Sequence, residues 1–143
     1  MKIAICVSLD FTNQIGSIID RLTEQGYEII LPQTVKMILS DEVTFEQIMK
    51  EKKNGEISKR AIRQNTLKNY FKTIKESDAI LVLNFDKNGI EGYVGGNTFL
   101  EMGFAQVLGK KIFLLNGIPN ISYEDEIKAM QPIVLNGNLS KIR

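Results

Sequence analysis

Short apolar runs alternate with amphipathic stretches along the whole chain. Five runs, at residues 1–7, 27–31, 78–84, 111–115 and 132–135, have the length of strands. Between them apolar residues recur every three or four positions, which predicts helices. Strands that are apolar at nearly every position are typical of a parallel sheet covered on both faces. We therefore predict one α/β domain over residues 1–143, a three-layer sandwich with a flavodoxin-like, five-stranded parallel sheet in the order 2-1-3-4-5.

A polar region separates the second and third apolar runs. Its pattern predicts one or two short helices, a break at residues 50–55, and a longer helix from about residue 57 to 74. Residues 50–75 contain nine Lys or Arg and two Glu, a local excess of seven positive charges. This excess could attract phosphate or nucleic acid, or could form a solvated helix surface. The whole chain has a net charge of only +1, so we expect neither a nucleic-acid nor a membrane partner.

The segment at residues 92–109 predicts a glycine loop followed by a helix. Gly95 and Gly96 free the backbone, Asn97 or Thr98 can cap the helix, and Gly109 ends it. A buried stripe is expected from its apolar residues, namely Leu100, Phe104, Val107 and Leu108. A helix N-terminus behind a glycine loop suits an anionic ligand.

One carboxylate in this helix has two interpretations. Glu101 lies on a face of mostly small or apolar residues and would point along the mouth of the sheet, as a catalytic group would. Alternatively, Thr98 and Glu101 fit a capping box, in which the glutamate only closes the first turn.

Composition narrows the chemistry that is possible. The chain has no histidine, which excludes His-dependent nucleophilic catalysis and the usual zinc sites. Its single cysteine, Cys6, cannot form an internal disulfide. We expect Cys6 to be buried in the core and the protein to occupy a reducing compartment. No dinucleotide-binding or P-loop pattern occurs, so we expect neither cofactor nor metal. No apolar run reads as a signal peptide or a membrane span, so we expect a cytoplasmic protein.

Several short motifs together resemble those of a known family. They are Ser77-Asp78 before an apolar run, the glycine loop, Glu101-Met-Gly-Phe-Ala105, and Gly109-Lys-Lys-Ile112. This stretch, residues 74–115, resembles the nucleoside 2-deoxyribosyltransferase superfamily, which includes the 2'-deoxynucleoside 5'-monophosphate N-glycosidases. The resemblance implies that Glu101 is the nucleophile that attacks the anomeric carbon of deoxyribose. It also implies a homo-oligomer.

Other positions depart from that family's pattern. Asn69 or Tyr70 stands where a second carboxylate is usual, Gly95 replaces an aspartate of the transferases, and Val7-Ser8 replaces a Gly-Ser pair. The candidate substrate-binding residues are Ser8, Asp10, Tyr70, Asp78, Gly95, Gly96 and Asn97.

Each candidate has an expected role. Ser8 and the glycine loop would hold phosphate or sugar, although Ser8 or Asp10 could instead serve as a turn or cap. Tyr70 would contact the leaving base. Asp86 or Glu91, in the loop after the third strand, could supply an acid or base.

These observations leave two main hypotheses about function, beside a third, a nucleic-acid-associated protein that uses the basic region at residues 50–75, against which the near-neutral total charge counts. The first is cleavage of the N-glycosidic bond, or deoxyribosyl transfer, on a nucleoside or nucleoside 5'-monophosphate. The alternative is a non-catalytic nucleotide-binding or sensor module of the same fold.

Overall fold

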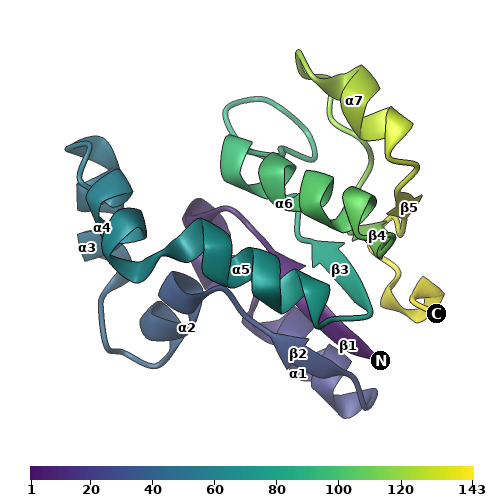
Figure 1. Ribbon diagram of the computed structural model, residues 1–143, viewed down its shortest axis with the longest axis horizontal. Helices are drawn as coiled ribbons and strands as arrows, with labels where there is room; N and C mark the ends of the chain where they lie inside the picture. The colour runs from purple at the N-terminus through teal and green to yellow at the C-terminus, as the bar shows by residue number, and fades with distance from the viewer.

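A five-stranded, entirely parallel sheet forms the centre of the molecule in the computed structural model, which describes residues 1–143 (Figure 1). The observed order, β2-β1-β3-β4-β5, confirms the predicted topology. The strands are β1 (Lys2–Cys6), β2 (Glu28–Ile30), β3 (Ala79–Val82), β4 (Lys111–Leu114) and β5 (Ile133–Val134). Cys6 and Val82 are partners in the register, so β1 and β3 end side by side.

Helices cover both faces of the sheet. They are α1 (Gly16–Glu24), α2 (Gln33–Leu39), α3 (Phe45–Lys53), α4 (Ile57–Gln64), α5 (Thr66–Lys75), α6 (Gly96–Val107) and α7 (Glu124–Ala129), with 3-10 turns η1 (Leu9–Gln14) and η2 (Leu139–Lys141). Figure 1 shows α5 and α6 side by side against one face, and α3 with α4 beyond the ends of the strands. None of these helices has both the length and the apolar character needed to cross a bilayer.

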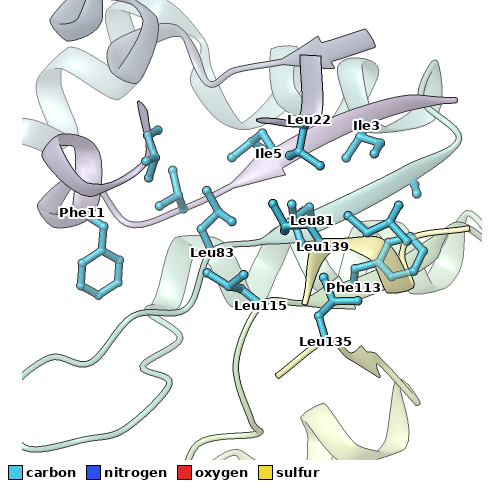
Figure 2. Packing of buried hydrophobic residues seen from close by; sticks show 14 of the residues in the cluster. Ile3, Ile5, Phe11, Leu22, Leu81, Leu83, Phe113, Leu115, Leu135 and Leu139 are labelled. Carbon is cyan, nitrogen blue, oxygen red and sulfur yellow. The ribbon is translucent and has the colours of Figure 1, made fainter. Parts of the chain in front are cut away.

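Alternate residues of β1, β3 and β4 pack into two separate cores. Ile3 and Ile5 of β1 pack with Leu22 of α1 and with Phe113 on one face (Figure 2). On the other face, Ala4 and Cys6 pack against Tyr70, Ile74, Met102, Ala105 and Ile127 of α5, α6 and α7. The near-continuous apolar runs of β1, β3 and β4 follow from this arrangement, because Ile3–Cys6, Ala79–Val82 and Ile112–Leu114 are all buried in one core or the other.

The helix expected over residues 57–74 is in fact two helices. α4 ends at Gln64 and α5 begins at Thr66, and Asn65 between them is left-handed (φ 49°, ψ 45°). Asn tolerates this conformation better than most residues, so it can end one helix and start the next without a glycine. The chain therefore turns at Asn65, and α4 has no buried residue.

The buried stripe predicted on α6 is only partly confirmed, because Phe104 and Leu108 are partly buried against the core. Leu100 is 49% exposed and Val107 is 86% exposed, whereas the buried side chains are Thr98, Glu101, Met102 and Ala105. The capping prediction also fails, because the helix begins at Gly96 with Gly95 as its cap and no side-chain cap bond. Glu101 thus lies beyond the first turn, and the capping-box interpretation does not apply. The predicted stop at Gly109 is confirmed by its φ of +69°.

Candidate functional site

A cavity of about 750 Å³ opens at the carboxyl edge of the sheet. It is lined by the segment that follows β1, from Val7 to Leu9, and by residues of α4, α5, the loop before α6 and the first turns of α6. This is the edge at which open α/β sheets bind ligands. Among the lining residues, those with polar or charged side chains include Ser8, Gln33, Thr34, Lys52, Ser58, Arg60, Asn65, Thr66, Lys68, Tyr70, Lys87, Tyr93, Asn97, Thr98 and Glu101.

Glu101 is the single carboxylate among the residues that line this cavity. It is only 3% exposed, because α6 lays it between the sheet and the cavity. Burial raises the pKa of Glu101 from 4.5 to about 8, and a hydrogen bond from the Cys6 thiol opposes this rise only in part. A carboxyl group with a raised pKa in a cavity is a common feature of catalytic sites.

The Cys6 thiol lies beneath Glu101, at the end of β1. It is fully buried and unpaired, as the sequence predicts. Burial raises the pKa of Cys6 well above 9.0, and the neighbouring Glu101 carboxylate raises it further. The thiol therefore stays protonated.

Asp10 joins two lysines at the mouth of the cavity. Lys52 Nζ of α3 lies 2.8 Å from Asp10 Oδ1, and Lys87 Nζ, from the loop after β3, bonds to Oδ2. Burial alone would raise the pKa of Asp10, but hydrogen bonds from Lys52 and Lys87 outweigh it, so the pKa lies below its ordinary value. Lys87 Nζ also lies 5.0 Å from the centre of the Tyr93 ring, at a distance typical of a cation–π contact.

A second ion pair supports the wall made by α4. Arg60 donates through Nε and Nη2 to the carboxylate of Glu51 on α3, at 2.7 and 2.8 Å. Glu51 is only 4% exposed, and the hydrogen bond from Arg60 lowers its pKa despite the opposing effect of burial. This paired geometry fixes α4 against α3, although α4 buries no side chain of its own.

Polar contacts fix the loop before α6. The buried Asn84 amide, just after β3, donates to the carbonyl oxygens of Gly92, Asn116 and Gly117 at 3.1–3.2 Å. Asp86 Oδ1 accepts from Gly92 N at 2.9 Å. Gly92 has a φ of +65°, and a Cβ there would lie 2.5 Å from the Gly117 oxygen. The loop therefore needs glycine at this position.

The structure brings most of the predicted site residues together. Ser8, Gly95, Gly96 and Asn97 all line the cavity with Glu101. Asp10 does not line it, but it holds the two lysines that do. The loop carboxylates Asp86 and Glu91 are exposed and lie outside the lining.

Two predictions of substrate contact need correction. Asp78 lies at the opposite edge of the sheet, where its Oδ2 accepts from the backbone N of Lys2 at 2.7 Å. Tyr70 borders the cavity, but its hydroxyl donates to the main-chain oxygen of Ile5, with the Ile30 oxygen at 3.3 Å. The Tyr70 hydroxyl thus stabilises β1 and β2, because a buried phenol needs an acceptor.

Sequence reasoning missed Asn84 and did not single out Lys52 or Lys87. Asn84 had a usable signal, since it is the polar residue that ends an apolar run at the functional edge of the sheet. Lys52 and Lys87 had none, because their common partner Asp10 is 42 and 77 residues away.

Comparison of the chain with protein-family models, with curated proteins and with solved structures gave no match. No group of three or more His, Cys, Asp or Glu side chains is arranged to hold a metal ion.

Proposed function

We propose that the protein cleaves the N-glycosidic bond of a nucleoside or nucleoside 5'-monophosphate, or transfers its deoxyribosyl group, with Glu101 as the nucleophile. The observation that carries the proposal is the buried Glu101 carboxyl group in a cavity that contains no other carboxylate. The resemblance of residues 74–115 to the nucleoside 2-deoxyribosyltransferase superfamily supports the same role.

In this proposal the sugar lies over Glu101, at the start of α6. The Glu101 carboxylate attacks the anomeric carbon, the bond to the base breaks, and a glycosyl ester forms on the enzyme. Water then hydrolyses the ester, or a second base accepts the sugar. Ser8 and the backbone of Gly95–Asn97 hold the sugar or its phosphate. The base lies against the apolar wall formed by Ile57, Ala61 and Leu67.

The test is release of free base from a panel of deoxynucleosides and their 5'-monophosphates, followed by chromatography. Exchange is tested by adding a second base. We expect release by the wild type and none by Glu101→Gln at equal folded concentration. Absence of release from every compound would overturn the proposed catalysis.

A second candidate is nucleotide binding without catalysis. It is favoured by the lack of a second carboxylate in the lining and by the use of the Tyr70 hydroxyl within the fold. Without an acid the leaving base would depart unprotonated, which slows glycosidic cleavage. Tight binding of a nucleotide with no base release would support this candidate.

We also propose a homo-oligomer in the cytoplasm. Large apolar side chains are exposed along α4, α5 and α6, among them Ile62 at 78% and Val107 at 86%. Such residues mark association surfaces when they gather on one side of a protein. The free, buried Cys6 is consistent with a reducing compartment. Sedimentation velocity on the purified chain tests association, and a monomer at all concentrations would contradict it.

A further inference from the structure

The mouth of the cavity carries more positive charge than its own carboxylates balance. Lys52, Arg60, Lys68 and Lys87 line the cavity, whereas Asp10 and Glu51 lie behind three of these side chains as their partners. The whole chain carries a net charge of only +1, so the excess of positive charge at the cavity is a local feature and not part of a general positive charge.

The cluster of Asp10, Lys52 and Lys87 holds this charge in a fixed place. One carboxylate faces two ammonium groups, so one positive charge is left without a partner. The side chains are only 20%, 33% and 25% exposed, respectively, which limits compensation by water. Each ammonium group has two further donors that can turn toward the cavity.

Three separate segments build this cluster. Asp10 comes from η1, Lys52 from the last turn of α3, and Lys87 from the loop after β3. The Tyr93 ring beneath Lys87 lies 3.4 Å from the position of a Cβ at Gly95, the cap of α6. The cluster is therefore close to the start of α6, whose first amides have no preceding turn to accept their hydrogen bonds.

We propose that Lys52 and Lys87, positioned by Asp10, form a phosphate subsite, so that the ligand of this cavity is a nucleoside 5'-monophosphate rather than an uncharged nucleoside. The proposal rests on the proposed function for the nucleoside part of the ligand, and on the charge cluster for the phosphate. A phosphate monoester is the class of anion that suits two ammonium groups held by one carboxylate beside a helix N-terminus.

Binding can be measured without turnover. Isothermal titration of Glu101→Gln with four deoxynucleosides, their 5'-monophosphates and inorganic phosphate separates recognition from catalysis. We expect at least one monophosphate to bind tenfold or more tightly than its parent nucleoside. Lys87→Met or Lys52→Met, each added to Glu101→Gln, should remove most of this preference and leave nucleoside affinity within about twofold.

The matched control is Lys53→Met, because Lys53 lies next to Lys52 on α3, is exposed, and does not line the cavity. It should leave the preference for the monophosphate unchanged. Equal affinity for nucleoside and monophosphate, no binding of any monophosphate, or an equal loss in the Lys53 variant would each overturn the proposal. Thermal melting verifies that every variant is folded.

The two proposals can fail independently. A preference for the monophosphate in a protein that releases no base would refute the catalytic function and leave the phosphate subsite. Base release with equal affinity for the nucleoside and its monophosphate would leave the catalytic function and refute the subsite.

Discussion

Replacing Glu101 by glutamine should change how the stability of the protein depends on pH. Glu101 is 3% exposed, and burial raises its pKa from 4.5 to about 8. Glutamine has nearly the same shape but cannot ionise. The substitution therefore removes the cost of burying a negative charge while it preserves the packing of α6.

The size of the effect follows from proton linkage. Below pH 4.5 the carboxyl group is protonated in both states, and its full contribution to stability is present. Between pH 4.5 and about 8 only the unfolded chain loses the proton, so the free energy of unfolding falls by about 1.4 kcal/mol for each pH unit. Above pH 8 both states are ionised, and the total loss is about 5 kcal/mol.

Urea unfolding at pH 5, 6, 7 and 8 measures this difference. We expect the stability of Glu101→Gln, relative to wild type, to rise by about 4 kcal/mol from pH 5 to pH 8. Work at or below pH 8 also keeps the unfolded Cys6 thiol, with an ordinary pKa of 9.0, mostly protonated.

The control for this series is Glu91→Gln, which removes an exposed loop carboxylate. Its stability relative to wild type should not follow the rise seen for Glu101→Gln. A difference between Glu101→Gln and wild type that is the same at all four pH values would refute the assigned burial cost.

Three further predictions concern catalysis and packing. If Glu101 is the nucleophile, base release should increase with pH up to about 8, because about one molecule in ten is ionised at pH 7; a rate that falls over this range would instead indicate an acid. Tyr70→Phe should reduce the free energy of unfolding by about 1–3 kcal/mol, measured in urea, because the main-chain oxygen of Ile5 loses its buried donor; an unchanged midpoint would contradict this. Gly92→Ala should lower the melting temperature, because Gly92 has a φ of +65° and the added methyl would meet the Gly117 oxygen. Gly103→Ala within α6 has open space around the added methyl and should raise the melting temperature. The opposite order of the two melting temperatures would contradict the loop geometry.

The sequence alone determined the sheet and its order. A nearly continuous apolar run such as Ala79–Val82 can bury all its side chains only in a sheet that is covered on both faces. The alternation of these runs with helices then predicts parallel strands. It also indicated the carboxyl edge of the sheet, and so placed Ser8, Gly95 and Glu101 at one site.

Local patterns misjudged the environment of α6. Leu100 and Val107 are exposed, while Glu101 is buried, because the helix turns the face that carries Thr98, Glu101, Met102 and Ala105 toward the interior. Periodicity gives the shape of a helix, but the choice of which face is buried depends on its neighbours.

Only the tertiary structure decided how the charged side chains are arranged at the site. The ion pairs of Asp10 with Lys52 and Lys87 span 42 and 77 residues, and Arg60 is held by Glu51 of a different helix. In the sequence Lys52 belongs to a basic segment and Lys87 to a turn, and both positions are typical of solvated side chains. Folding brings both lysines to Asp10 because η1, the end of α3 and the loop after β3 meet at the edge where the parallel strands end. A local sequence pattern cannot predict contacts between segments so far apart in the chain.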